Sequence, residues 1–369
     1  MRNDSRQPRG LVKVNGEVLP GWINWEVDNN NFYQADTFRV SFALSLMPFE
    51  RNAEWWAART EIFIEILAGF PADADNFTSS EMVSLIYGRV DDVTYDPVGR
   101  KIDLSGRDLT SAFVDAKTTE KFLNYTSSEI AVVLALRHGL TAVVTKTETI
   151  SGRYYEIDHG RLTDQRSEWD LLTWLAHEEQ FMVYVKGHEL HFEPKPSPDD
   201  DPYVLKWEPL TEDRGHPVFN GKTISFSRNL TLAKDVIVRV RSWNAKNKSG
   251  FTKTAQATHN KNTVLKGAAQ PIGEAQTFSY TIPGLTPEQA LQRAQSLLVE
   301  ITAHQVKLSA TFPADNLLSV TNVIKVIGTM SAFDQIYYPD SIIRQMSIGE
   351  GYTMSINAKN HSPESVVAT

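Results

Sequence analysis

The sequence predicts a mainly β, α+β fold in which two antiparallel β-barrels flank a small α+β domain. Three observations lead to this prediction. Apolar and polar residues alternate through much of the first 110 residues, which is the period of a half-buried strand. Helical spacing replaces this alternation after Gly106, and strand patterns return beyond a proline-rich stretch at 193–202. The chain of 369 residues is also longer than one ordinary domain of about 100–200 residues.

Composition narrows the class of protein. Hydrophobic residues make up 41% of the chain and charged residues 22%, values that exclude a disordered, collagen-like or coiled-coil chain. No apolar run approaches the ~18 residues of a membrane helix, and residues 1–10 are polar, so we expect neither membrane insertion nor a signal peptide. The absence of cysteine excludes disulfides, zinc ribbons, iron–sulfur clusters and thiol nucleophiles. The net charge of −8 disfavours a protein that coats nucleic acid.

Strand and turn signals fill residues 1–110, where we expect the first barrel. Asn15-Gly16 is typical of a two-residue hairpin turn, because both positions favour positive φ. A second hairpin is predicted for residues 82–95 and 101–105, with a short helix before it at 53–58. A strand with one solvent-exposed face is predicted from the alternating apolar residues Phe38, Val40, Phe42, Leu44 and Leu46.

Residues 111–195 are predicted to form the small α+β domain. Thr126-Ser127-Ser128-Glu129 is a capping box, and the helix that it starts is expected to end at His138-Gly139. A second helix starts near Ser167 and runs into a hairpin over 181–192. The buried face of this second helix is predicted to carry Trp169, Leu172 and Ala176.

A linker rich in proline and aspartate at 196–204 leads to a second barrel at 205–358 with one helix. Val236, Val238 and Val240 alternate with other residues, which predicts a strand over 235–243. The region Lys246–Lys266 contains five lysines and no acid, which predicts an exposed loop.

The end of the second barrel combines a helix with closing strands. Thr286-Pro287-Glu288-Gln289 is expected to cap the helix, whose buried face is predicted to carry Leu291, Ala294, Leu298 and Ile301. Strands are predicted within 306–312, 322–328 and 335–356, and a flexible tail at 359–369.

A weak internal similarity connects the two β-rich regions. Tyr87-Gly88 with Tyr95-Asp96-Pro97 is similar to Ile327-Gly328 with Tyr337-Tyr338-Pro339-Asp340, and each segment is followed by a strand ending in glycine, at Gly106 and Gly349. Such a repeat indicates two copies of one barrel, which we expect to superpose over about residues 10–110 and 205–355.

The strongest catalytic candidates are the histidines and carboxylates of His177-Glu178-Glu179 and His188-Glu189-Leu190-His191. Metal sites combine these residue types, but a zincin requires two histidines four residues apart on one helix. Here Phe181 occupies the position four residues after His177, and residues 188–191 lie on a predicted strand, where neighbours face opposite sides. We therefore interpret these residues as solvated hairpin residues.

Carboxylate pairs are the second catalytic candidate, at Glu168/Asp170, Asp91/Asp92 and Asp199-Asp200-Asp201. A glycosidase needs two carboxylates about 5–10 Å apart, and sequence alone does not establish such a pair. The chain also lacks a phosphate-binding glycine loop, a dinucleotide fingerprint and a Gly-x-Ser-x-Gly motif. We predict no enzyme activity, no catalytic, cofactor-binding or metal-ligating residue, and no cofactor.

Two further sets of residues could serve binding. Lys246–Lys266 could contact DNA or another polyanion, but only Trp243 and Phe251 supply aromatic rings there, which favours a solvated loop. The tryptophans are scattered along the chain, so we expect core or interface residues rather than a ligand cage: Trp22, Trp25, Trp55, Trp56, Trp169, Trp174, Trp207 and Trp243.

Residues 87–115 resemble the baseplate hub proteins of contractile-tailed bacteriophages, the Mu-like tail hub and late control protein D family. In that family a β-hairpin leads into Ser-Gly-Arg-Asp-Leu-Thr and then a short helix ending in aspartate, as in Ser105-Gly106-Arg107-Asp108-Leu109-Thr110 and Asp115 here. The resemblance continues, in the family's order, through Thr126-Ser127-Ser128-Glu129, Gly139-Leu140, Ser167-Glu168-Trp169-Asp170, Leu190-His191-Phe192, Gly328, Tyr337-Tyr338 and Gly351-Tyr352-Thr353-Met354.

The resemblance implies a structural baseplate hub located in the virion and assembled in the host bacterial cytoplasm. Each chain of a homotrimer would contribute two tube-like barrels, so that a threefold ring presents six similar units. Such a ring adapts a trimeric central spike to the sixfold tail tube. The partners implied are a second and third copy of this chain, the spike, the tail tube protein and baseplate wedge proteins, and phage DNA would only pass through the channel.

Two alternatives remain open from the sequence. A tail-associated cell-wall hydrolase would have convergent carboxylates in a cleft, whereas a hub would have a large trimer interface and no turnover. A hub component of a related contractile injection system is the other alternative. The sequence leaves open the role of Lys246–Lys266 and the charge of the channel.

Overall fold

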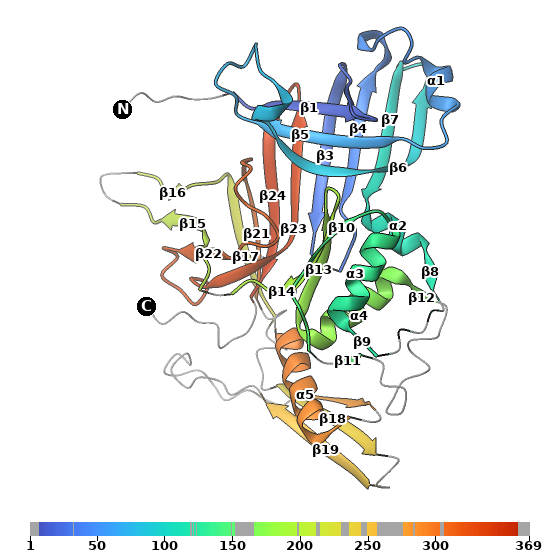
Figure 1. Ribbon diagram of the computed structural model, residues 1–369. Coiled ribbons are helices and arrows are strands. Elements are labelled where there is room, and N and C mark those ends of the chain that lie inside the picture. The colour runs from blue at the N-terminus through green and yellow to red at the C-terminus, as the bar shows by residue number, and fades with distance from the viewer. Residues whose placement is uncertain are drawn as a thin grey trace.

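The computed structural model describes residues 7–360 with internal gaps. Residues outside the description are 1–6, 32, 119, 121, 123, 149, 152–165, 198, 212–214, 230–235, 245–248, 257–275, 283–284, 303–305 and 361–369. Within the described part, the fold is mainly β with a small α+β domain, as predicted (Figure 1).

The first barrel consists of seven strands. They are β1 (Arg9–Val14), β2 (Glu17–Val18), β3 (Trp22–Asn30), β4 (Thr37–Ala43), β5 (Phe63–Gly69), β6 (Val83–Asp96) and β7 (Lys101–Asp108). Their order in the sheet is β2-β1-β5-β6-β7-β4-β3, and all neighbours are antiparallel. Asn15 and Gly16 form the predicted hairpin turn, with φ of 50° and 86°.

In the first barrel one strand is shorter than the sequence predicts, and the predicted hairpin after it is present. The predicted strand over 38–46 ends earlier, because residues after β4 form the 3₁₀ helix η1 (Leu44–Leu46) and Leu46 is exposed. The hairpin of β6 and β7 is confirmed; the Asp96 carboxylate accepts hydrogen bonds from the Val98 and Gly99 amides in its turn. Short helices α1 (Ala53–Ala57) and η2 (Ser79–Glu81) lie in the connections on either side of β5.

The α+β domain packs two capped helices against a three-stranded sheet. Its elements are α2 (Thr110–Asp115), β8 (Lys117–Thr118), β9 (Tyr125–Thr126), α3 (Ser127–Arg137), β10 (Thr141–Val144), β11 (Ile150–Ser151), β12 (Arg166–Ser167), α4 (Glu168–Glu179), β13 (Phe181–Lys186) and β14 (Glu189–Pro194). Both capping boxes are present, between Thr126 and Glu129 and between Ser167 and Asp170. The domain has its own core, which includes Phe113, Trp169 and Phe192.

The second barrel follows the proline-rich linker. Its strands are β15 (Tyr203–Glu208), β16 (Val218–Phe219), β17 (Thr223–Arg228), β21 (Val306–Pro313), β22 (Ile324–Ile327), β23 (Ile336–Ser347) and β24 (Gly351–Lys359). Their order is β16-β15-β22-β23-β24-β21-β17. The last strand reaches Lys359, and Asn360 is buried and bonded to Val306, so the ordered chain extends past the predicted start of the tail; residues 361–369 lie outside the described residues.

A separate unit is inserted between β17 and β21. It consists of the sheet β19-β18-β20 and one helix, with bounds β18 (Val236–Asn244), β19 (Ser249–Gln256), β20 (Gln276–Thr281) and α5 (Pro287–Thr302). Part of the predicted lysine-rich loop is therefore strand β19, whereas residues 246–248 and 257–266 lie outside the described part. The predicted buried face of α5 is largely confirmed: Ala294 is buried, and Leu298 and Ile301 pack against the core of the unit. Leu291 is the exception, since it is 38% exposed, and Ala290 and Leu297 are buried as well.

The two barrels form one continuous sheet with a shared core. β3 pairs with β23, and the core runs from Val12 and Trp25 in the first barrel to Leu308 and Ile356 in the second. Figure 1 shows β1 and β5 crossing over β3 and β24, while the α+β domain lies below β6 and β7 in this view and the inserted unit extends away from the barrels. None of the helices among the described residues has the length and apolar character needed to cross a bilayer.

Candidate functional site

The histidines singled out in the sequence lie in contacts between domains. His177 of α4 stacks on Tyr33, which precedes β4, with ring centroids 4.2 Å apart. His188, in the turn before β14, contacts Tyr87 of β6 at 4.4 Å. Both histidines therefore connect the α+β domain to the first barrel.

The neighbouring candidates His191 and Glu179 contact partners within the α+β domain. His191 stacks on Tyr184 at 4.6 Å, and its ring nitrogens lie 3.4 Å and 3.5 Å from the carboxylates of Glu189 and Glu193. Glu179 accepts a hydrogen bond from Ser127 Oγ at 2.7 Å. Among the described residues, histidine, aspartate and glutamate side chains nowhere gather in a group of three or more suited to a metal ion.

The predicted carboxylate pairs do not converge on a cleft. Glu168 is buried, binds Arg137, and lies 2.5 Å from His138 Nε2. Asp170 belongs to the capping box of α4. Asp200 bonds the Ser197 amide in the linker. These three carboxylates therefore have structural partners.

The Gly-Arg-Asp-Leu-Thr motif forms the joint between the first barrel and the α+β domain. A Cβ on Gly106 would lie 2.1 Å from the Arg89 carbonyl oxygen, so only glycine fits between β7 and β6. The Asp108 carboxylate accepts hydrogen bonds from the Thr110 amide and hydroxyl, at 3.2 Å and 2.9 Å, where α2 begins. The motif thus has a structural role in this chain.

A carboxylate pair, the partly buried Asp36 and the buried Asp108, lies behind this joint, and sequence reasoning missed it. Asp36 accepts hydrogen bonds from Asn29 Nδ2 and the Asn30 amide, both at 2.7 Å. Desolvation raises the pKa of Asp36 to about 7, and nearby Asp28 adds to the rise. Desolvation and the charge of Asp36 together raise the pKa of Asp108 well above its usual range. Asp36 follows a loop and carries no motif, so only its burial identifies it.

The seam between the barrels is an antiparallel pairing of β3 with the second half of β23. It extends from Asn30 opposite Ser341 to Asn24 opposite Ser347. Arg344 is buried on the core side and donates to the Asp315 and Leu318 carbonyls and to Asn29 Oδ1. Residues more than 300 positions apart thereby join the two barrels into one sheet.

The barrels share one strand order. The first reads β1-β5-β6-β7-β4-β3 and the second β15-β22-β23-β24-β21-β17. Matching these lists position by position also preserves the order along the chain: β1, β3, β4, β5, β6, β7 against β15, β17, β21, β22, β23, β24. One pair differs, since β1 and β5 are antiparallel but β15 and β22 are parallel.

The pairing registers refine this match to single residues. The β6/β7 ladder has a bulge at Asp91 and the β23/β24 ladder a bulge at Asp340. Asp91 binds Arg107 of β7 at 2.7 Å, and Asp340 binds Lys359 of β24 at 2.8 Å. Counting along the ladders from the bulges places Arg107 and Lys359 at equivalent positions. The sequence similarity had paired Tyr87 with Ile327, which is wrong, because Ile327 ends β22 whereas Tyr87 lies in β6.

The same register aligns the buried side chains of β4 and β21. Phe38, Val40 and Phe42 in the first barrel correspond to Leu308, Ala310 and Phe312 in the second, and all six are buried in the shared core. The opposite face of these strands is polar in both barrels.

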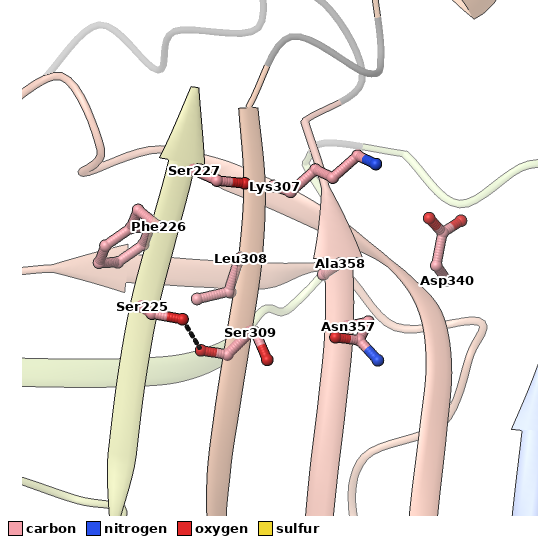
Figure 2. Close-up of a pocket in the computed structure, with 9 residues that line it drawn as sticks. All are labelled: Ser225, Phe226, Ser227, Lys307, Leu308, Ser309, Asp340, Asn357 and Ala358. Atoms are coloured by element: carbon pink, nitrogen blue, oxygen red, sulfur yellow. Dashed lines mark hydrogen bonds between the residues drawn. The ribbon is translucent and has the colours of Figure 1, made fainter. Parts of the chain in front are cut away.

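This polar face runs without interruption from β17 to β6 and is the candidate functional surface. It carries both signs of charge, for example at Glu26, Arg39, Asp103 and Lys307. Figure 2 shows a pocket on its β17 side, where Ser225 Oγ donates a 3.5 Å hydrogen bond to the Ser309 carbonyl. The lining mixes small polar side chains with the charged Lys307 and Asp340 and with the apolar Phe226, Leu308 and Ala358.

Comparisons with known proteins agree with this architecture. No protein-family model and no curated protein sequence matches the chain. A tail protein from Neisseria meningitidis MC58 has a similar structure, with a TM-score of 0.69, 13% sequence identity, and coverage of 98% of this chain and 99% of that one. The 43 kDa tail protein of prophage MuSo2 from Shewanella oneidensis has a TM-score of 0.66 and 16% identity over 97% and 99% of the two chains.

A third similar structure comes from a secretion machine. It is an E. coli component of the type VI secretion system, described as structurally similar to bacteriophage T4 tail proteins, with a TM-score of 0.53 and 9% identity over 95% of this chain and 77% of that one. At these identities the comparisons establish the fold, which is the fold expected from the resemblance to baseplate hub proteins.

Proposed function

We propose that this protein is the structural hub of a phage tail baseplate, a homotrimeric ring that adapts a threefold central spike to a sixfold tail tube. The observation that carries the proposal is the shared strand order of the two barrels within one continuous sheet. Three chains that each supply two similar units form a ring of six, which can contact both a threefold and a sixfold partner.

The polar face of the sheet would line the channel of this ring. Apolar side chains of the same strands face the core, so the opposite face is the one left for water and for passing DNA. Acidic and basic side chains alternate on it, which avoids the uniformly positive surface that would hold a polyanion. DNA would therefore pass without being bound.

The other partners would be the spike, the tail tube protein and baseplate wedge proteins, in the virion after assembly in the host cytoplasm. Several connecting loops expose apolar side chains at the barrel end opposite the α+β domain, including Phe49, Val98 and Ile348. Exposed apolar loop tips favour protein contacts, and the tube or the spike would supply them. The similarity to a type VI secretion component supports, as a second candidate, a hub of a related contractile injection system.

The test is the mass of the purified chain, alone and with its neighbouring tail proteins. We expect a species of about 125 kDa, three times the 41.5 kDa chain. A dimer or tetramer without a threefold axis, in the presence of the tail partners, would contradict the proposal.

The alternative of a cell-wall hydrolase predicts a different outcome. We expect no peptidoglycan release by the wild-type protein, and expect the alanine variants of His177, Glu178, His188 and His191 to assemble like the wild type. These side chains make structural contacts, and loss of ring stacking costs about 0.5–1.5 kcal/mol. A release rate that falls in any of these variants would favour the enzyme.

A further inference from the structure

We propose that the ring closes by one specific strand pairing: β17 of one chain lies antiparallel to the second half of β6 in the next chain. The proposal rests on the ring of the proposed function and names its contact. In the register that we infer, Thr94 of one chain lies opposite Ser227 of its neighbour, with Asp92 opposite Asn229 and Asp96 opposite Ser225.

The internal seam supplies the template for this contact. Strand β23 is divided: Ile336 and Tyr337 pair with β22, whereas residues 341–347 pair with β3 of the other barrel. Strand β6, its counterpart, is divided in the same way. Residues 83–89 pair with β5, and on that side residues 91–96 have no strand partner among the described residues. The second half of β6 is thus an open edge in the single chain.

The counterpart of β3 is also open. Strand β3 pairs with β4 on one side and β23 on the other, whereas β17 pairs with β21 alone in the described part of the chain. The two strands of the internal seam, β23 and β3, therefore have counterparts, β6 and β17, whose corresponding edges have no strand partner in the described part of the chain. An edge strand with free amides and carbonyls is a template for pairing with another chain.

The two bulges fix the register. Aligning Asp91 with Asp340 places Thr94 at the position of Ile343, and the ladders through β4 and β21 place Ser227 at the position of Asp28. Asp28 lies opposite Ile343 at the internal seam. The same relation between chains puts Ser227 opposite Thr94.

Side-chain burial supports the same surface. Ile342 and Arg344 are 0% and 3% exposed, because β3 covers them at the internal seam. Their counterparts Val93 and Tyr95 are 39% and 48% exposed. These two side chains would become buried if a strand equivalent to β3 were added.

The opposing strand carries the matching apolar residues. Trp25 and Val27 of β3 face the core at the internal seam, and Ile224 and Phe226 occupy their positions in β17. Both are partly buried and pack at the margin of the core. Phe226 of one chain would therefore contact Tyr95 of the next, an aromatic pair across the strands.

Charge also favours the pairing. The open half of β6 carries Asp91, Asp92 and Asp96, whereas Arg228 ends β17 and Lys307 lies on the adjacent strand. In the register given above, Asp92 and Asp96 would meet the uncharged Asn229 and Ser225, whereas pairing of β6 with another β6 would place aspartates opposite aspartates. The partner of this open edge is therefore β17 of a second copy of this chain.

Disulfide trapping tests the register, because the chain contains no cysteine that would interfere. The double variant Thr94→Cys with Ser227→Cys places one thiol on each side of the contact, on exposed residues of the polar face. Directly opposed Cα atoms in antiparallel strands lie about 4.5–5.5 Å apart, within reach of a disulfide. On oxidation we expect covalent species of two and three chains and none larger, because a closed ring has three contacts.

Two control variants calibrate the result. Thr94→Cys with Thr223→Cys shifts one thiol by four residues, about 13 Å along the strand, so we expect no cross-link. Glu26→Cys with Gln345→Cys reproduces the pair at the internal seam, where the two side chains are hydrogen-bonded, and should form a disulfide within one chain. Mixing the two single variants Thr94→Cys and Ser227→Cys should give covalent dimers only.

The outcomes separate this inference from the proposed function. A trimer by mass without the 94–227 cross-link, or with the shifted cross-link instead, overturns the pairing but leaves the ring hub standing. A covalent ladder beyond three chains contradicts closure at three. A monomer without cross-links, in the presence of the tail partners, overturns both.

Discussion

The two barrels have the same strand order but differ in what surrounds it. In the first, a six-residue connection at 31–36 joins β3 to β4, whereas in the second the equivalent connection between β17 and β21 holds the sheet β18 to β20 and helix α5. In the first, β1 is antiparallel to β5, and in the second β15 is parallel to β22. The central strands are thus the shared part, and the connections and outer strands have diverged.

This comparison explains why the repeat is nearly invisible in the sequence. The inserted unit separates counterparts by different distances along the chain, and buried positions keep only their apolar character, as Phe38 and Leu308 do. Packing accepts many apolar residues of suitable volume, so the pattern persists after the identities have changed. Equivalent positions in the two barrels therefore offer matched experiments.

The largest expected effect comes from truncating the shared core in each barrel. Phe42→Ala and Phe312→Ala should each lower the free energy of unfolding by about 3–5 kcal/mol, because both side chains are buried at equivalent positions. Denaturant unfolding followed by circular dichroism measures this. Phe49→Ala, at an exposed side chain, is the control and should change it by about 0.5 kcal/mol or less. A loss below about 1 kcal/mol at either core position would contradict the equivalence.

Arg344 lies at the seam formed within the chain, and its counterpart Tyr95 lies on the edge that is open in the single chain. Truncating the two side chains should therefore have different effects. Arg344→Ala should cost about 3 kcal/mol, since it leaves the Asp315 and Leu318 carbonyls without their donor. Tyr95→Ala should leave the stability of an isolated chain within about 0.5 kcal/mol, because the ring is half exposed. The same Tyr95 variant should shift the monomer–trimer equilibrium toward monomer in analytical ultracentrifugation. Equal stability losses for both variants would show that the two positions are not counterparts in this sense.

Gly106 and its counterpart Ala358 test how tightly the two hairpins pack. Gly106→Ala should cost about 2 kcal/mol, since the added Cβ meets the Arg89 carbonyl and the Phe38 ring. Ala358→Gly should cost about 1 kcal/mol, through lost packing and a more flexible unfolded chain. Thermal unfolding of both variants is the measurement; a stabilised Gly106→Ala variant would exclude the close approach of β7 and β6.

A pH dependence of stability is expected from the first barrel. Because the folded-state pKa of Asp36 is about 7 and its ordinary value is 3.8, the folded chain binds a proton that the unfolded chain releases between these values. The free energy of unfolding should therefore fall as pH rises from about 4 to about 7. Asp36→Asn should reduce this slope, leaving the part that is due to Asp108. Denaturant midpoints at several pH values give the slope, and an unchanged slope would contradict the burial of Asp36.

Local sequence signals predicted the local structure well. The Asn15-Gly16 turn, the Thr126 capping box, the helix start near Ser167 and the β6/β7 hairpin are confirmed, because each depends on the backbone preferences of a few adjacent residues. The alternation of β4 correctly identified its buried face but placed its end too late, since leucines also fit the following 3₁₀ turn. In α5 the helix and most of its buried face were predicted correctly, and only Leu291, at the margin of the apolar face, is exposed.

The sequence by itself determined the α+β class, many of the elements, and the alternation that gives strands such as β4 a buried and a polar face. Only the tertiary structure decided which strands are neighbours. The seam joins residues such as Glu26 and Gln345, which lie 319 positions apart, and no local preference encodes such a contact. The pair of Asp36 and Asp108 was equally hidden, since an aspartate near a turn reads as solvated until packing removes its water. Local geometry is set by adjacent residues, whereas pairing and burial are set by the whole chain.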